Sequence, residues 1–137
     1  MVYHTTEYNL GGTGTWGTFD DLKPAVTRAI REVEDRADEF DVIAVQGVSG
    51  MSVGFPLACA IGKPIVVVRK DFEIENGNSH SYDRLIGVRS LKGKRCLFVD
   101  DFVSMGGTRA RVRQAVEADG GKLVAQYMGR ENTYTLL

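Results

Sequence analysis

Apolar residues recur along the chain in two patterns, one with the spacing of a helix and one in short continuous runs. Helical spacing is found over residues 22–37 and again over 108–119, where Gly120 and Gly121 end it. The continuous runs are typical of strands that are buried on both faces. They predict four strands, at residues 42–45, 64–68, 95–99 and 122–128. The strand at 122–128 is the last one that the pattern predicts.

Shorter elements lie between these segments. Residues 85–88 are apolar enough for one more short strand, and residues 91–94 predict a surface turn. A glycine-rich turn at 47–54 leads into a short helix over 55–61, whereas residues 70–82 are polar and predict a long mobile loop. Strands that alternate with helices predict an α/β fold, with a mostly parallel central sheet flanked by helices on both faces.

Composition narrows the class of protein. The 137 residues predict a single domain, residues 1–137, and the 43% hydrophobic content is that of a globular protein. A net charge of -1 gives no general attraction to nucleic acid or to a membrane, and no apolar run is long enough to span one. The N-terminus is too polar for a signal peptide, so we expect a cytoplasmic protein. Cys59 and Cys96 lie in apolar stretches, which predicts two buried free thiols.

The end of the strand at residues 95–99 carries the most chemistry. Two carboxylates, Asp100 and Asp101, follow it and can accept hydrogen bonds from two neighbouring sugar hydroxyls. A loop of small or flexible residues then opens a helix, whose unpaired amides and positive dipole end favour a phosphate. A sugar-phosphate site and an ordinary strand-to-helix turn both fit this pattern. Gly106 and Gly107 would let the backbone wrap a phosphate closely, and Ser104 and Thr108 can add hydroxyl donors.

Residues 99–108 resemble the signature of the type I phosphoribosyltransferases that binds 5-phosphoribosyl-1-pyrophosphate (PRPP). In that signature an apolar strand precedes two acidic residues, two apolar residues and a loop that ends in Gly, a small residue and Thr. The resemblance implies that Asp100 and Asp101 are catalytic residues that hold the ribose hydroxyls. It also implies that the 5-phosphate binds to the loop formed by Ser104, Met105, Gly106, Gly107 and Thr108.

A second glycine-rich turn, at residues 45–54, resembles the pyrophosphate loop of the same family. The resemblance implies pyrophosphate contacts from Val48, Ser49 and Gly50, and it makes the Val48–Ser49 bond the candidate for a cis peptide. Ser49 stands where the family usually has Lys or Arg, a departure that weakens the electrostatics on the pyrophosphate side. Without the resemblance, this segment is an ordinary connection between a strand and a helix.

Basic and hydroxyl side chains after the next strand complete the implied site. Arg69 and Lys70 stand where family members commonly place a basic residue that meets the pyrophosphate, although both also fit solvated surface cations. Arg69 is favoured because its guanidinium binds phosphate in a bidentate manner. Ser81 and Tyr82 resemble the Ser-Tyr pair of the flexible catalytic loop of several members. His80 beside them fits a surface histidine better than a general base.

The family builds its base-binding hood from variable terminal segments, and this chain offers a small one. Ser104 stands where some oxopurine enzymes have an acidic residue that assists the base, which argues against that subgroup. The acceptor is left open, with a purine slightly preferred over orotate. The hood candidates are Tyr3, Tyr8, Trp16, Phe19, Met128, Arg130 and Tyr134.

The resemblance implies transfer of the 5-phosphoribosyl group from PRPP to a nucleobase, with release of pyrophosphate. Mg²⁺ is the implied cofactor, carried by PRPP and contacted at most by Asp100 through water. The expected partners are PRPP, pyrophosphate and a nucleobase, with no nucleic acid and no membrane, and a homodimer is a family expectation. Two alternatives are a non-catalytic regulatory module that binds PRPP or a nucleotide, and an α/β domain for another sugar phosphate.

Overall fold

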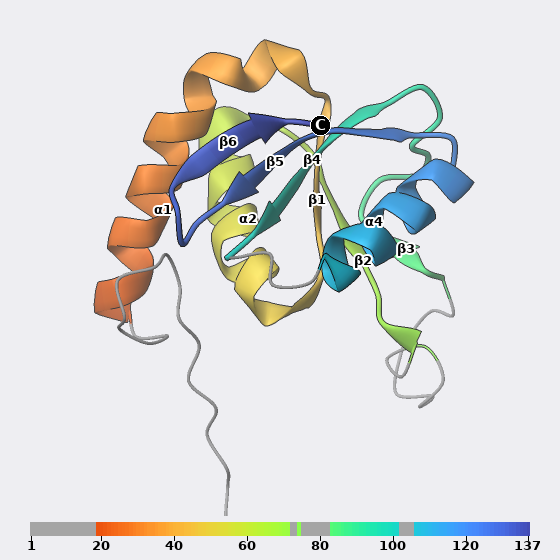
Figure 1. Cartoon of the computed structure of the whole chain (residues 1–137), viewed down its shortest axis with the longest axis horizontal. Helices are drawn as coiled ribbons and strands as arrows, with labels where there is room; N and C mark the ends of the chain where they lie inside the picture. Colours follow the sequence, from red (N-terminus) through yellow and green to blue (C-terminus); the bar gives the residue numbers. More distant parts are fainter. Residues whose placement is uncertain (1–18, 72–73, 75–82, 102–105) are drawn as a thin grey trace, which may run out of the picture.

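A six-stranded sheet forms the centre of the molecule (Figure 1). The computed structural model describes residues 19–71, 74, 83–101 and 106–137. The strands are β1 Val42–Val45, β2 Ile65–Val68, β3 Leu85–Ile86, β4 Arg95–Asp100, β5 Lys122–Met128 and β6 Thr133–Leu136. Their order is β3-β2-β1-β4-β5-β6. The four inner strands run parallel, and the two edge strands are antiparallel to their neighbours.

Helices lie on both faces of this sheet (Figure 1). On one face are α1 Phe19–Val33, continued by the 3-10 helix η1 Glu34–Glu39, and α2 Gly47–Ile61, while α4 Gly107–Ala118 lies on the other. Alternate strand positions point to opposite faces, so the core divides into two clusters. Ala29 and Leu57 pack with Leu97 in one cluster, and Val112 and Val116 pack with Phe98 in the other. The predicted α/β class with a mostly parallel sheet is confirmed.

The start of the second helix differs from the sequence-based expectation. A turn is predicted over residues 47–54, whereas α2 begins at Gly47. The helix lies very close to the sheet, because a Cβ atom on Gly50 would stand only 2.9 Å from the carbonyl oxygen of Val99. Glycine favours a turn by its own propensity, but here it permits the close packing that holds this segment as a helix.

The edge strands also correct the predictions. The antiparallel strand β6 follows the strand that the sequence predicts to be the last, and it buries Tyr134 in the core. Its alternation of Thr and Tyr is the signal of a strand with one buried side. β3 comprises two residues rather than the four predicted, and Gly87 follows it with a φ of 131°. That conformation favours glycine and ends the regular strand.

Two statements about burial are also corrected. Cys96 is buried as expected, but Cys59 is exposed because it lies on the outer side of α2. Leu91, predicted in a surface turn, is fully buried in the cluster below α4. In the described parts of the chain, no helix combines the length and the apolar character needed to cross a membrane.

Candidate functional site

Polar side chains are buried at the edge of the sheet where the parallel strands end. In the described part of the chain, the buried polar or charged residues are Gln46, Arg69 and Asp100, exposed by 3%, 6% and 8%. Gln46 follows β1, Arg69 follows β2 and Asp100 ends β4. These strands are neighbours in the sheet, so the three residues lie at one edge. Burying polar groups costs free energy, and ligands bind at this edge of such sheets, so it is the candidate site.

Asp100 and Asp101 form the acidic pair at the end of β4. Asp100 Oδ1 accepts hydrogen bonds from Ser49 Oγ at 3.0 Å and from the backbone N–H of Asp101 at 2.9 Å. The pKa of Asp100 is raised to about 7, mainly by burial and also by the Asp101 carboxyl, although these two donors oppose the rise. Asp100 is buried beside α2 and Asp101 is half-buried, so the acidic pair does not stand in open solvent.

The N-terminus of α4 follows the acidic pair. Gly106 precedes the helix with a φ of 76°, a left-handed conformation that favours glycine. Gly107 and Thr108 stand in the first turn, which contains no acidic residue to balance the positive end of the helix dipole. Ser104 and Met105 lie outside the described residues, so their predicted phosphate contacts stay predictions.

Two arginines flank this helix start, and the sequence-based site includes neither. Arg109 Nη1 donates to Gln126 Oε1 at 2.8 Å, and Gln126 belongs to β5. Arg111 donates from Nε to Gln46 Oε1 at 3.4 Å and from Nη2 to Thr108 Oγ1 at 3.3 Å. Gln126 lies in β5 and Gln46 follows β1, and these are the strands on either side of β4. Because Arg111 and Gln46 are 65 residues apart, no local pattern reveals their contact.

Lys70 brings positive charge to the start of α2. Its Nζ lies 3.6 Å from the position that a Cβ atom would take on Gly47, the first residue of the helix. Arg69, the favoured candidate, is buried, and its Nη1 donates to the carbonyl oxygen of Asp83 at 3.1 Å. Val48 is 51% exposed, and the described residues contain no cis peptide bond, so the expected one after Val48 is not found. This bond lies inside the regular helix.

A cleft of about 1630 Å³ opens beside these residues. Gln46, Lys70 and Arg111 line part of it, and residues 83–89 and the side of α4 line the rest. An excess of basic side chains favours an anionic ligand. The charged lining residues are Arg69, Lys70, Arg84, Arg89 and Arg111 against Asp71, Asp83 and Asp119.

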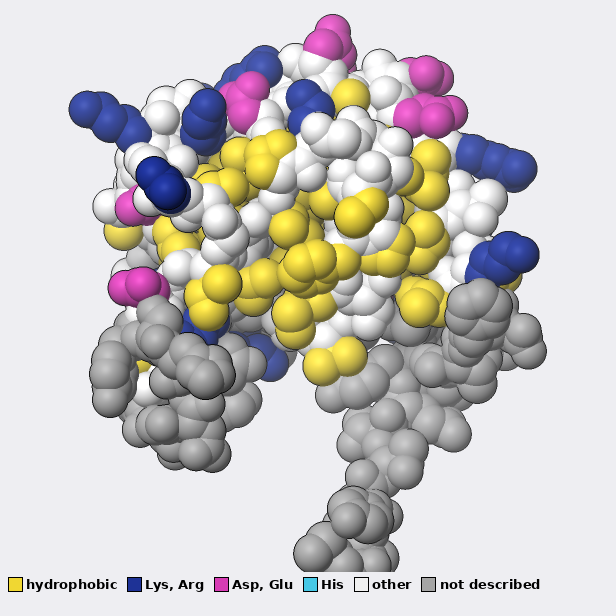
Figure 2. All heavy atoms as spheres, turned by 180° about the vertical axis from the view of Figure 1, so that it is seen from behind, with side chains coloured by type: hydrophobic (Ala, Val, Ile, Leu, Met, Phe, Trp, Pro, Cys, Tyr) yellow, Lys and Arg dark blue, Asp and Glu magenta, His cyan; other side chains and the backbone are white. Residues whose placement is uncertain are grey.

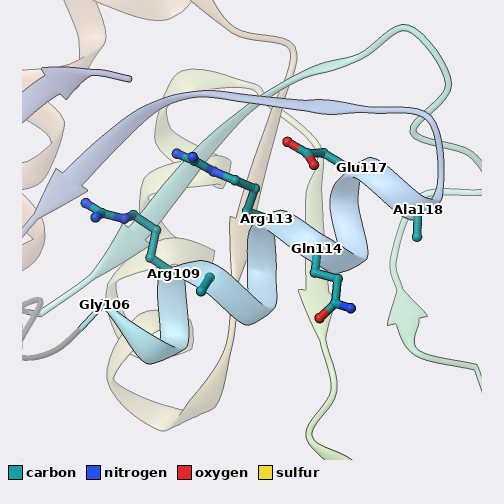
Figure 3. A pocket seen from close by; sticks show the side chains of 7 residues that line it. Gly106, Arg109, Arg113, Gln114, Glu117 and Ala118 are labelled. Atoms are coloured by element: carbon teal, nitrogen blue, oxygen red, sulfur yellow. The ribbon is translucent and has the colours of Figure 1, made fainter.

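A smaller groove of about 580 Å³ runs along one side of α4. Figure 3 shows Arg109 and Arg113 projecting from the same side of this helix, one turn apart, with Glu117 a turn further on. Gly106 and residues of α4 supply all of the lining, so the groove is a surface feature of one helix. Among these side chains, Arg109 reaches the sheet through its hydrogen bond to Gln126 of β5.

The other predicted site residues are distributed differently. Of the hood candidates, Met128 and Tyr134 are core residues, and Arg36 stacks on the Tyr134 ring with its Cζ 4.7 Å from the centroid. Arg130 is exposed and donates its backbone N–H to the carbonyl oxygen of Asp101 at 2.7 Å. Tyr3, Tyr8, Trp16, His80, Ser81 and Tyr82 lie outside the described residues, as does the side chain of Phe19.

No protein-family model matches the chain, but known proteins are similar to it in sequence. Adenine phosphoribosyltransferase of Agathobacter rectalis is 32% identical over 77% of this chain and 64% of its own length. Adenine phosphoribosyltransferase of Clostridium botulinum is 32% identical over 80% of this chain and 67% of its own length. A hypoxanthine/guanine phosphoribosyltransferase of Methanothrix thermoacetophila is 37% identical over 60% and 47%. The chain thus spans about half to two thirds of the length of these curated relatives.

Solved structures share the fold. Adenine phosphoribosyltransferase of Thermoanaerobacter pseudethanolicus matches with a TM-score of 0.61 and 22% identity, over 87% of this chain and 83% of its own. Orotate phosphoribosyltransferase of Mycobacterium tuberculosis, in complex with PRPP, matches with a TM-score of 0.60 and 22% identity. The match covers 76% of this chain and 58% of the orotate enzyme. The Clostridium botulinum enzyme is 32% identical, and this chain covers two thirds of its length. This similarity and the shared fold together establish the family of the chain. The chain belongs to the type I phosphoribosyltransferases.

Proposed function

We propose that the protein is a cytoplasmic phosphoribosyltransferase that transfers the 5-phosphoribosyl group of PRPP to a nucleobase and releases pyrophosphate. One observation carries the proposal: Ser49 in the first turn of α2 contacts Asp100 at 3.0 Å, so two helix N-termini flank the acidic pair. PRPP presents a phosphate, a ribose and a pyrophosphate in a row, which matches this order. The relatives that are named adenine phosphoribosyltransferase support a purine over orotate as the acceptor.

Each group in the site would bind one part of PRPP. The carboxylates of Asp100 and Asp101 would accept hydrogen bonds from the ribose hydroxyls. Backbone amides at the start of α4 would bind the 5-phosphate, with Arg109 and Arg111 adding positive charge beside them. The start of α2 and the Lys70 ammonium would meet the pyrophosphate, which matches their position at the neighbouring strand ends.

We propose that Mg²⁺ arrives with PRPP. In the described residues, no group of three His, Cys, Asp or Glu side chains could hold a metal ion. Asp100 and Asp101 do supply adjacent carboxylates, and one or two carboxylates together with substrate phosphates and water form a normal Mg²⁺ environment. Asp100 would hold the ion through a water molecule. When bound, Mg²⁺ neutralises charge on the pyrophosphate leaving group.

The proposed reaction is a displacement at the anomeric carbon of the ribose. The bond from this carbon to the pyrophosphate oxygen breaks, a bond to a nitrogen of the base forms, and the proton of that nitrogen is released to pyrophosphate or water. Positive charge develops on the ribose, so the ionised acidic pair beside it would stabilise the transition state. Ser81 and Tyr82 would close over the site to exclude water, the role that their likeness to the family's catalytic loop implies.

Calorimetry on an Asp100→Ala, Asp101→Ala double variant tests the site. PRPP binding in the presence of Mg²⁺ should be lost, because each charge-assisted hydrogen bond contributes about 1.5–3 kcal/mol. An Arg113→Ala variant is the control, since Arg113 is exposed and one turn further along α4 than Arg109. Unchanged PRPP affinity in the double variant would remove the central claim.

Pyrophosphate release measures the proposed activity directly. The protein, Mg²⁺ and PRPP would be mixed in turn with adenine, hypoxanthine, guanine and orotate, and release with adenine is the expected outcome. A regulatory module without turnover is the second candidate, and the uncharged Ser49 at the start of α2 is the observation that favours it. PRPP binding without pyrophosphate release for any base would establish that alternative.

We also propose that the protein forms a homodimer through the outer face of α2. None of the 15 residues of this helix is charged, and Phe55 remains 44% exposed. Figure 2 shows apolar side chains gathered across the face of the molecule on which α2 lies. A large exposed apolar surface marks an interaction site. Light scattering on the purified protein gives the mass, and Phe55→Glu should convert a dimer to a monomer.

A further inference from the structure

Ser49 occupies an unusual position for a serine at the edge of a ligand site. It is the third residue of α2, and its Oγ donates to Asp100 Oδ1 at 3.0 Å. The next residue, Gly50, lies so close to β4 that an added Cβ atom would stand 2.9 Å from the carbonyl oxygen of Val99. Backbone packing therefore fixes the distance between the helix and the strand end. The hydroxyl is held against the carboxyl by the fold.

The Ser49 contact restricts how the Asp100 carboxyl can turn. Rotation of a carboxyl group about its terminal torsion is soft, so an aspartate without fixed donors samples many orientations. Here the backbone N–H of Asp101, just after β4, and the hydroxyl of Ser49, in α2, both donate to Oδ1. Two donors from different directions fix this oxygen, and Oδ2 is then presented in a defined direction.

The same contact limits what else Ser49 can do. A serine hydroxyl has one hydrogen to donate, and an ionised carboxylate is a stronger acceptor than most alternatives. Ser49 carries no charge, and its hydroxyl hydrogen is donated to Asp100. Its contact therefore lies on the side of the site that would bind ribose. The Lys70 ammonium lies near the first residue of α2, on the side that the proposed function gives to pyrophosphate.

We propose that Ser49 is a positioning residue that orients the Asp100 carboxylate for the ribose hydroxyls, so that substitution at this position weakens recognition of ribose rather than of pyrophosphate. The inference rests on the proposed function, because it takes the acidic pair to be the ribose site. It assigns to a residue of the pyrophosphate-loop segment a role in another part of the substrate. A direct contact between Ser49 and pyrophosphate is the competing role.

Two probes that each carry half of the substrate separate these roles. Ribose 5-phosphate contains the ribose but no pyrophosphate, and inorganic pyrophosphate with Mg²⁺ contains no ribose. Calorimetry at pH 8, above the raised pKa of Asp100, would compare the wild type with Ser49→Ala, Ser49→Thr and the control Ser52→Ala. Ser52 belongs to the same helix, but its Oγ donates to the carbonyl oxygen of Val48 at 2.7 Å.

Ser49→Ala should bind ribose 5-phosphate about tenfold more weakly, the loss expected for one hydrogen bond that orients a charged group. Its affinity for Mg²⁺-pyrophosphate should stay within about twofold of the wild type. Ser49→Thr retains the hydroxyl and should restore ribose 5-phosphate binding, and Ser52→Ala should change neither affinity. This rescue distinguishes positioning from a general loosening of the fold.

Two results would overturn the inference alone. In the first, Ser49→Ala binds ribose 5-phosphate as tightly as a wild type that does bind it. In the second, Ser49→Ala loses Mg²⁺-pyrophosphate affinity as strongly as ribose 5-phosphate affinity, which would establish direct contact with pyrophosphate. A wild-type protein that binds neither ribose 5-phosphate nor PRPP would overturn the proposed function, and this inference with it.

Discussion

The two ends of the parallel strands each hold an acidic residue, and the pKa values of these two residues are shifted in opposite directions. At the edge where β1 and β4 begin, Asp41 accepts hydrogen bonds from Nε and Nη2 of Arg95 at 3.1 and 3.0 Å, and from its backbone N–H at 2.9 Å. Those bonds lower the pKa of Asp41 to about 2. At the edge where β4 ends, Asp100 is buried beside another acid, and its pKa is raised to about 7.

The difference separates an acid that is paired with a cation inside the fold from an acid that is buried beside another acid. Asp41 is paired with Arg95, which donates to both of its carboxylate oxygens, so the charge of Asp41 is compensated within the fold. Asp100 has two neutral donors and an acidic neighbour, so ionisation of its carboxyl group costs free energy unless a ligand or a cation compensates the charge. Perturbed carboxylates of this kind cluster at functional sites, and the destabilisation is an expected consequence of function.

Replacement of Asp100 should give the largest effect on stability, in the stabilising direction. The folded-state pKa lies above the ordinary value, so the folded protein binds the proton more tightly than the unfolded chain, and stability falls as pH rises from about 4 to about 7. Asp100→Asn removes this loss and should raise the free energy of unfolding at pH 8 by roughly 2–4 kcal/mol. Urea denaturation at pH 8 and pH 4 measures the gain, which should disappear at pH 4. A variant less stable than the wild type at pH 8 would refute the comparison.

Glycine substitutions should sharpen the contrast at an intermediate scale. Gly50→Ala places a Cβ atom against the backbone of Val99 and should lower the free energy of unfolding by about 1–3 kcal/mol. It should also weaken ribose 5-phosphate binding, since the Ser49 contact depends on this packing. At the other end of the strands, Gly93 has a φ of 71° and open space around it. Gly93→Ala should therefore lower the free energy of unfolding by about 1 kcal/mol and leave the affinity for ribose 5-phosphate unchanged. Equal affinity losses in both variants would show that binding only follows stability.

The smallest expected effect comes from the ion pair. Asp41→Asn should lower the free energy of unfolding at pH 7 by about 0.5–1 kcal/mol, because the pair is partly exposed to solvent. The folded-state pKa is lowered, so this contribution is present above the ordinary value and is lost as pH falls from about 4 to about 2. Denaturation curves of wild type and variant should therefore converge in acid. A difference that persists at pH 2 would point to packing rather than charge.

The inner part of the fold could be predicted from sequence because it is encoded locally. β1, β2, β4 and β5 are largely apolar segments, and α4 begins after Gly106, whose left-handed conformation favours glycine. The start of α2 could not be predicted, because Gly47 and Gly50 favour a turn until the sheet beside them is present. β6 was hidden by its short polar alternation after the last continuous run.

The candidate site divides in the same way. Asp100 and Asp101 could be identified because a short motif of adjacent residues places them at a strand end. Their burial, and the arginine–glutamine contacts on either side of α4, depend on strand order, which no spacing in the sequence encodes. The predicted roles of Ser81, Tyr82 and the phosphate-loop residues Ser104 and Met105 stay predictions, since these lie outside the described residues.

The pairing of β1 with β4 has a consequence for the order of events during folding. Ser49 and Asp100 are 51 residues apart, and Asp41 and Arg95 are 54 apart, yet both contacts span this one strand pair. Closing such a loop loses chain entropy before any contact compensates, which makes pairings of this kind slow to form. During synthesis, a ribosome-bound chain that stops before β4 would have β1 and α2 without the strand that separates β1 from β5. The ligand site would therefore appear late and in a single step.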